Sequence, residues 1–153
     1  MARASTRTNP ESRAPEQESG WPTWCDPVAA ERLREIVSGG QISQCYLFSG
    51  PTGVGKRALA RAFAQALMCE QPDESNPAQP CGVCRPCRNV LKSAHPDIEM
   101  FDLQAQATLL EGKVGKGSTL TIEMVRQLRA ASALLPLEAS RRLIIVDDAE
   151  TLL

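Results

Sequence analysis

Hydrophobic residues recur at helical spacing in three parts of the chain. The first part has Asp26 as a helix cap and Gly39-Gly40 as the stop. The second part runs over residues 58–67, and the third over residues 121–135, with a shorter helix expected over residues 88–94. The third helix is expected to bury one face, formed by Ile122, Val125, Leu128 and Leu135.

Short apolar runs between these helices predict strands. Residues 46–48 form one such run, residues 98–101 alternate between apolar and polar like a strand, and residues 143–146 are apolar throughout. A strand without polar positions is typical of the middle of a parallel sheet that is covered on both faces. Strands and helices in this order predict an α/β fold with a parallel sheet.

A glycine-rich stretch, G-P-T-G-V-G-K-R, follows the first predicted strand and leads into a helix. Tight turns at its glycines would bring backbone N–H groups to a phosphate, and the helix N-terminus and Lys56 would add positive charge. The stretch matches G-x-x-x-x-G-K-[ST] except at its last position, where Arg57 replaces the hydroxyl residue that coordinates magnesium. Phosphate binding is therefore better supported than magnesium-dependent hydrolysis, and a glycine turn that has lost its ligand is the alternative. The predicted nucleotide-binding residues are Gly50, Pro51, Thr52, Gly53, Val54, Gly55, Lys56 and Arg57.

Two acids, Asp147 and Asp148, directly follow the apolar run at residues 143–146. At the carboxyl end of a parallel strand they would lie beside the phosphate loop of the neighbouring strand. One acid could then hold a magnesium-bound water and the next could orient an attacking water. This motif is weak alone and gains support from the glycine-rich stretch upstream.

Four of the six cysteines have the spacing of ligands for one metal ion. Cys69 ends the second helix, and Cys81, Cys84 and Cys87 follow a polar, proline-rich insertion, giving C-x11-C-x2-C-x2-C. Four thiolates can surround one tetrahedral zinc ion, with the short spacings forming a knuckle, so we expect a structural zinc site. Disulfides are disfavoured in a cytoplasmic protein, whereas an iron–sulfur cluster fits the same spacing. The other two cysteines are expected to be small core residues.

Composition narrows the class of protein. A chain of 153 residues with 42% hydrophobic residues is sufficient for one domain core, and a net charge of -1 gives no general signal for polyanion binding. Residues 1–20 are expected to be a disordered tail, and residues 21–153 a partial domain with a zinc-binding insertion at about 69–90. No apolar run is long enough to span a membrane, and the tail lacks the apolar centre of a secretory signal, so a cytoplasmic location is expected.

Three aromatic or titratable side chains have two interpretations each. Trp21 and Trp24 could form a lid on a nucleotide base or an anchor for the first helix, and the anchor is favoured because aromatic burial is stabilising wherever it occurs. His95 precedes a proline at a turn, which favours a loop or cap residue over a ligand or base.

Residues 103–120 contain three glycines and show no clear periodicity, so a mobile loop is expected there.

The motifs together closely resemble those of the bacterial clamp loader. The resemblance covers nearly all of residues 26–153 and is carried by L-F-S-G-P-T-G-V-G-K, C-G-V-C-R-P-C, H-P-D, the Ile-x-x-x-Arg helix at 122–126 and R-L-I-I-V-D-D-A-E. The match is closer to the delta-prime subunit of DNA polymerase III than to the gamma/tau ATPase. Asp148 stands where the motor subunit has a glutamate, and Arg57 where it has a serine or threonine.

This resemblance implies a P-loop AAA+ domain with an incomplete parallel sheet and an inserted zinc module, with Cys69, Cys81, Cys84 and Cys87 as zinc ligands. It implies that residues 50–56 cradle nucleotide phosphates, that Asp147 is the magnesium-associated acid, and that Asp148 is the catalytic candidate. ATP with magnesium is thus a possible cofactor. Because Asp148 is one methylene shorter than glutamate and Arg57 has no hydroxyl, weak or absent hydrolysis is expected.

The implied partners are the gamma/tau and delta subunits, with the sliding clamp and primer-template DNA contacted through the assembled complex. Members of this family are longer, so the chain is expected to be a fragment or a truncated product. An active gamma/tau-type ATPase is the alternative function. Two further alternatives are a P-loop kinase with a zinc-stabilised lid and a zinc-binding interaction module with an inactive loop.

Overall fold

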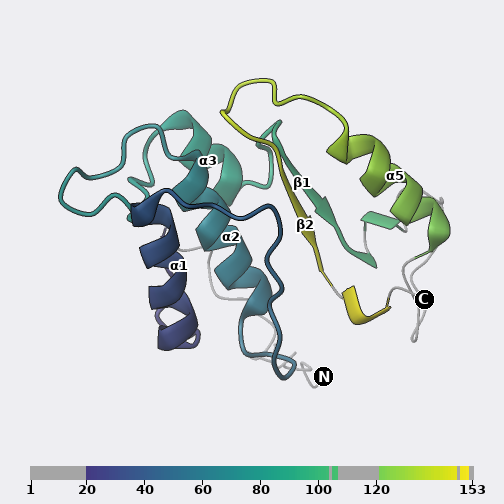
Figure 1. The fold of residues 1–153 in the computed structure, drawn as a ribbon, viewed down its shortest axis with the longest axis horizontal. Helices are drawn as coiled ribbons and strands as arrows, with labels where there is room; N and C mark the ends of the chain where they lie inside the picture. Colours follow the sequence, from purple (N-terminus) through teal and green to yellow (C-terminus); the bar gives the residue numbers. More distant parts are fainter. Residues whose placement is uncertain (1–19, 104, 107–120, 148, 152–153) are drawn as a thin grey trace, which may run out of the picture.

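The computed structural model describes residues 20–103, 105–106, 121–147 and 149–151. Its elements are α1 (Pro27–Gly39), α2 (Lys56–Met68), α3 (Arg85–Leu91), β1 (Ile98–Phe101), α5 (Ile122–Ser132), β2 (Leu143–Val146) and the short 3-10 helix η2 (Ala149–Thr151). Figure 1 shows α1, α2 and α3 on one side of the two strands and α5 on the other. The prediction of helices combined with a parallel sheet is confirmed.

The first core cluster joins α1 to α2. The Asp26 carboxylate caps α1 by accepting the N–H of Val28 at 2.8 Å, and Gly40 ends the helix with a φ of 67°. Leu33 of α1 belongs to the same buried cluster as Phe63 of α2. The sequence therefore located both helices correctly. No described helix is long and apolar enough to cross a membrane.

The strand predicted at residues 46–48 is not formed in the described structure. Tyr46 and Phe48 pack against the first core cluster, and the Tyr46 ring lies edge-on to Phe63 with centroids 5.0 Å apart. Leu47 between them is 85% exposed. The alternating burial of a strand is thus present, but a strand also needs a neighbour that supplies backbone hydrogen bonds, and β1 and β2 pair with each other.

The sheet of the described residues consists of β1 and β2 alone. They run in parallel with Ile98 opposite Leu143 and Phe101 opposite Val146. All four residues of β2 are half-buried, and β2 has a neighbouring strand on one side only, so the prediction of a middle strand was wrong for the described part of the chain. The pairing nevertheless brings the carboxyl ends of the two strands together, which positions the acids that follow them.

The second core cluster lies between α5 and the sheet. Met124 and Ala131 of α5 are buried with Phe101 of β1, and Leu128 packs against them. The face predicted for this helix was wrong in part, because Ile122 is 56% exposed and the helix ends at Ser132. Since apolar residues occur on more than one side of α5, contact with the sheet selects which side is buried.

Smaller deviations concern three other predicted segments. The helix α3 begins and ends three residues earlier than expected over 88–94, with Pro86 in its first turn, where proline is favoured. Residues 103, 105 and 106 are helical, and the rest of the loop predicted over 103–120 lies outside the described residues, as does residue 104. The predicted tail likewise lies outside them, apart from Gly20.

Candidate nucleotide site and four-cysteine cluster

The glycine-rich loop turns sharply into α2. Gly53 and Gly55 both have a φ of 86°, a backbone conformation that glycine adopts without strain. Gly55 is also the residue before α2, and a Cβ atom there would lie 2.4 Å from Cys25 Sγ and 2.5 Å from the Trp24 ring. Only glycine therefore fits at this position. The first N–H groups of a helix have no partner within the helix, so this end of α2 can donate hydrogen bonds to an anion.

Lys56 extends over the loop that precedes it. Its ammonium Nζ lies 3.0 Å from the carbonyl oxygen of Gly50 and 3.2 Å from that of Pro51. A lysine ammonium has three N–H donors and carries a compact positive charge. It is therefore placed to contact a phosphate oxygen bound on the glycine loop.

Arg57, one residue further on, reaches the ends of both strands. Its Nη1 lies 3.2 Å from Asp147 Oδ2 and its Nη2 lies 3.0 Å from Asp102 Oδ2. The structure thus brings Asp147 to the first turn of α2, as the sequence led us to expect, but through an ion pair. Asp148, the predicted catalytic residue, lies outside the described residues, and its role stays a prediction.

Asp102 was missed by sequence reasoning. It directly follows β1, just as Asp147 directly follows β2, and the two strands are paired up to Phe101 and Val146. The segments I-E-M-F-D and L-I-I-V-D each consist of a four-residue strand and the acid that directly follows it. That shared pattern was the signal available in the sequence.

The two tryptophans have separate environments. Trp21 is buried in the first core cluster, and its indole N–H donates to the carbonyl oxygen of Ala78 at 2.9 Å. Trp24 is 50% exposed and its ring lies against Gly55 of the glycine-rich loop. The anchor interpretation therefore describes Trp21. The position of Trp24 leaves the interpretation as a lid on a base open for that residue.

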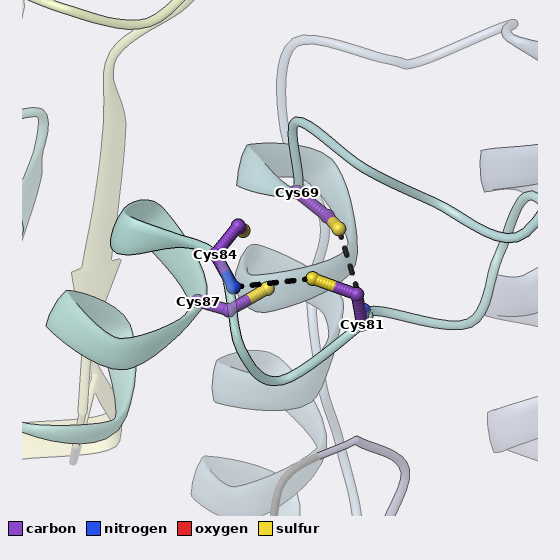
Figure 2. Close-up of side chains that lie close together, drawn as sticks. All are labelled: Cys69, Cys81, Cys84 and Cys87. Carbon is purple, nitrogen blue, oxygen red and sulfur yellow. Dashed lines mark hydrogen bonds between the residues drawn. The ribbon is translucent and has the colours of Figure 1, made fainter.

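The four cysteines of the predicted zinc site converge in space. Their Sγ atoms all lie within 4.8 Å of one another, and Figure 2 shows them gathered between the end of α2 and the start of α3. Zinc–sulfur bonds of about 2.3 Å in a tetrahedron require sulfur atoms about 3.8 Å apart, so the cluster is compact enough to hold one metal ion. The cluster consists of Cys69, Cys81, Cys84 and Cys87.

Backbone hydrogen bonds to sulfur shape this cluster. The N–H of Cys81 donates to Cys69 Sγ at 3.4 Å, and the N–H of Cys84 donates to Cys81 Sγ at 3.3 Å. The bond from Cys84 lowers the pKa of Cys81 to about 6, because it stabilises the thiolate. Burial raises the pKa of Cys87. Burial also raises the pKa of Cys69, and the backbone N–H groups that lower it only partly offset this effect. A bound cation would favour the thiolate form of all four.

Two polar side chains of α2 hold α3 beside the cluster. Gln65, which is buried, accepts the N–H of Gly20 at 2.9 Å and donates to the carbonyl oxygen of Cys87 at 3.2 Å. Arg61 donates to the carbonyl oxygens of Val90 and Leu91 at the end of α3. The helix α2 therefore connects the glycine-rich loop, which ends at Gly55, with the cysteine cluster, which begins at Cys69.

The two remaining cysteines differ. Cys25 is buried beside the phosphate loop, with its Sγ 3.6 Å from the carbonyl oxygen of Gly55, whereas Cys45 is exposed and so is not the core residue that we predicted. His95 is buried, and its Nδ1 accepts the N–H of Asp97 at 3.1 Å. This contact agrees with the loop role predicted for the histidine.

Comparison with known proteins places the chain in a family. The family described as "DNA polymerase III, delta subunit" matches residues 25–153. The gamma/tau subunit of DNA polymerase III from Mycobacterium tuberculosis is 34% identical over 117 residues, which are 76% of this chain and 18% of that protein. The tau subunit from Escherichia coli is 39% identical over 84 residues, which are 52% of this chain and 13% of that protein. Protein STICHEL-like 2 from Arabidopsis thaliana is 28% identical over 125 residues, 82% of this chain and 13% of that protein.

The chain thus spans less than a fifth of the length of these relatives. The family match, in contrast, covers every described element from α1 to η2. The order of glycine loop, four-cysteine cluster and acid-ended strand is the order on which the resemblance to clamp-loader subunits rested. This chain therefore belongs to the DNA polymerase III delta-subunit family, and the predicted resemblance to a clamp-loader subunit is confirmed.

Proposed function

We propose that this chain is part of a delta-prime-like clamp-loader subunit, which helps to load the sliding clamp onto DNA during replication in the cytoplasm. It would bind nucleotide on residues 50–57 and hydrolyse it weakly or not at all. The observation that carries this proposal is the loop itself: glycine geometry and Lys56 suited to phosphate, combined with Arg57 in the position of the hydroxyl residue.

Phosphate binding is supported by the donors gathered at one point. The N-terminus of α2, the left-handed Gly53 and Gly55, and the Lys56 ammonium all lie within this loop. A phosphate group there would accept several hydrogen bonds and meet a full positive charge. The half-exposed Trp24 ring beside Gly55 is available to contact the base.

Weak hydrolysis is supported by the chemistry of Arg57. A guanidinium has only N–H donors, so it offers no oxygen ligand for magnesium. Asp147, the acid predicted to be associated with magnesium, pairs with this guanidinium at 3.2 Å. Its role in metal binding stays a prediction.

A second candidate is an active ATPase of the gamma/tau type. It is favoured by the identity of 34% to the mycobacterial gamma/tau subunit over three quarters of this chain. Both candidates require nucleotide binding, so turnover is the property that separates them.

ATP binding and turnover by the full chain test both candidates. Lys56→Ala removes the loop ammonium, and Lys92→Ala, which removes an exposed lysine after α3, is the matched control. Binding without turnover that is lost only with Lys56→Ala supports the delta-prime-like function. Turnover that depends on Lys56 favours the gamma/tau type instead. The absence of binding would reject both, and phosphoryl transfer to a small nucleotide would indicate a kinase.

We also propose that the four-cysteine cluster holds a structural zinc ion. All four positions of a tetrahedral ion would be filled by thiolates, which leaves no position for a substrate. Zinc content per chain tests this, with Cys87→Ser as the perturbation and the exposed Cys45→Ser as the control. Iron and sulfide in place of zinc would support the iron–sulfur alternative. The absence of both zinc and iron from the wild-type chain would refute the site.

The proposed partners are the gamma/tau and delta subunits, with the sliding clamp and primer-template DNA contacted through the assembled complex. The family match and the relatives named for DNA polymerase III support this assignment. Reconstitution of the full chain with gamma/tau and delta subunits, followed by size-exclusion chromatography, tests it. Elution of this chain apart from the other subunits would contradict the proposal.

A further inference from the structure

Two acids stand next to each other at the carboxyl ends of the paired strands. Asp102 follows β1 and Asp147 follows β2, and the N–H of Asp147 donates to the carbonyl oxygen of Phe101 at 2.8 Å. This hydrogen bond continues the pairing of β1 with β2 and holds the two acids side by side. Adjacent carboxylates repel each other when both are charged, so this arrangement favours a cation between them.

The Arg57 guanidinium is that cation. Its Nη2 lies 3.0 Å from Asp102 Oδ2 and its Nη1 lies 3.2 Å from Asp147 Oδ2, so one fork contacts both acids. Nη2 also lies 3.0 Å from the sulfur of Met100. The side chains of Asp102 and Asp147 are only 12% and 23% exposed, which reduces the screening of these ion pairs by water.

The residues present do not fit a magnesium ion at this place. Magnesium requires near-octahedral oxygen ligands, and in P-loop proteins one of them is the hydroxyl that Arg57 replaces. Here the same position supplies a positive charge that pairs with one oxygen of each acid, and the other oxygen of Asp102 accepts the N–H of Ala105. A metal ion would have to displace the guanidinium and would then lie beside its charge.

We propose that Arg57 is a built-in cation that takes the place of a divalent metal between the phosphate loop and the two strand-end acids. ATP therefore binds to this chain without a divalent metal. The inference rests on the proposed nucleotide site, because ATP binding without a divalent metal can be observed only if the loop binds phosphate. The Arg57 side chain is 47% exposed and has more N–H groups than its three contacts use, so it can also donate to a phosphate oxygen.

Manganese binding tests the exclusion of metal without any nucleotide. The full chain is titrated with MnCl2 and free Mn²⁺ is followed by electron paramagnetic resonance. Arg57→Thr introduces a hydroxyl and removes the guanidinium from both acids, and Arg57→Ser is a second variant of the same kind. Arg32→Thr, at a 77% exposed position on α1, is the matched control. We expect a Mn²⁺ site in Arg57→Thr that is absent from the wild type and the control, and lost when Asp147→Asn is added.

The affinity for ATP, measured with excess MgCl2 and again with EDTA, tests whether ATP binds without a divalent metal. Wild-type affinity should agree within about twofold between the two conditions, whereas Arg57→Thr should bind about tenfold more tightly with magnesium, a coupling of ordinary size. A wild-type affinity that falls about tenfold in EDTA overturns the inference.

The manganese titration and the ATP measurement together distinguish failure of this inference from failure of the proposed nucleotide site. If no variant binds ATP, the nucleotide site is refuted and the manganese titration decides the role of Arg57 alone. Wild-type Mn²⁺ binding that requires Asp147, or Arg57 variants with no more Mn²⁺ affinity than the wild type, overturns the inference. Circular dichroism of each variant establishes that the fold is retained.

Discussion

Asp97 anchors the segment between α5 and β2, and its removal should be among the most destabilising single substitutions. Its carboxylate has no exposed surface and accepts the N–H groups of Leu137, Glu138 and Ala139 at 2.6, 2.8 and 2.8 Å. The backbone of Asp97 also accepts the N–H of Leu143, the first residue of β2. One residue thus fixes the path of the chain where it enters β2, the strand that precedes Asp147.

The magnitude follows from these three contacts. A hydrogen bond to a charged group contributes about 1.5–3 kcal/mol, but neighbouring bonds are not additive, and water can replace Asp97 at residues 137–139. Leu137, for example, is 76% exposed. We expect Asp97→Ala to lower the free energy of unfolding by about 3 kcal/mol, and Asp97→Asn, which keeps one acceptor oxygen, by about 2 kcal/mol. Asp73→Asn, in an exposed turn, is the matched control and should leave the free energy of unfolding nearly unchanged.

The effect should also depend on pH. Burial alone would raise the pKa of Asp97, but the N–H groups of Leu137, Ala139 and Glu138 outweigh it and lower the pKa. A carboxyl group whose pKa is lower in the folded state stabilises the protein above its unfolded pKa of about 3.9, and this stabilisation is lost as the pH falls through the folded pKa. The difference between wild type and Asp97→Ala should therefore shrink below about pH 4.

Urea unfolding followed by the fluorescence of the buried Trp21 provides the assay. Wild type, both Asp97 variants and the control are compared at neutral pH and at acid pH. The reasoning is refuted if Asp97→Ala is no more destabilising than the control. A difference from wild type that stays constant as the carboxyl group is protonated would refute the electrostatic part alone.

Three further predictions concern the loop and the cysteine cluster. Gly55→Ala should abolish ATP binding because its Cβ would lie 2.4 Å from a neighbouring sulfur, whereas Gly39→Ala, with nothing within 4 Å, should bind normally in the same titration. Gln65→Leu should lower the free energy of unfolding, measured in urea, by about 1–3 kcal/mol, because the buried N–H of Gly20 and carbonyl oxygen of Cys87 lose this partner. An unchanged midpoint of urea unfolding would contradict the bridging role of Gln65. In metal-free protein, alkylation of Cys81 should persist as the pH falls to about 6, where its thiolate is half protonated, whereas an ordinary exposed thiol should lose reactivity near its usual pKa of about 8.5. Mass spectrometry after a brief pulse of iodoacetamide distinguishes the two patterns.

Local sequence signals predicted the features that depend on nearby residues. The cap at Asp26, the stop at Gly40 and the amphipathic face of α2 all act within a few residues, and the structure has each of them. The cysteine cluster was also predictable, because three of its members lie within one turn and the start of a helix. The fourth cysteine, Cys69, lies 12 positions before Cys81, and its place at the end of a predicted helix was the signal that assigned it to the cluster.

Features set by distant partners were predicted less well. Residues 46–48 have the alternation of a strand, but whether they form one depends on a neighbour elsewhere in the sequence. The buried side of α5 was misjudged for a similar reason, because the sheet selects Met124 and Ala131 from a helix with apolar residues on several sides. Hydrophobic periodicity indicates that a face exists, whereas tertiary contact decides which one is used.

Arg57 shows how a local interpretation can be incomplete without being wrong. In the sequence it is the missing hydroxyl of a familiar loop, and the inference of reduced magnesium chemistry follows from that loss. In the structure the same side chain contacts acids 45 and 90 positions away along the chain, as their residue numbers show. Arg57 therefore lacks the hydroxyl of the usual loop and also brings a positive charge to two acids, which the local pattern could not show. If Arg57 is the built-in cation that we propose, the loop keeps the left-handed glycines and the Lys56 ammonium suited to an anion while the guanidinium occupies the place of a metal ion.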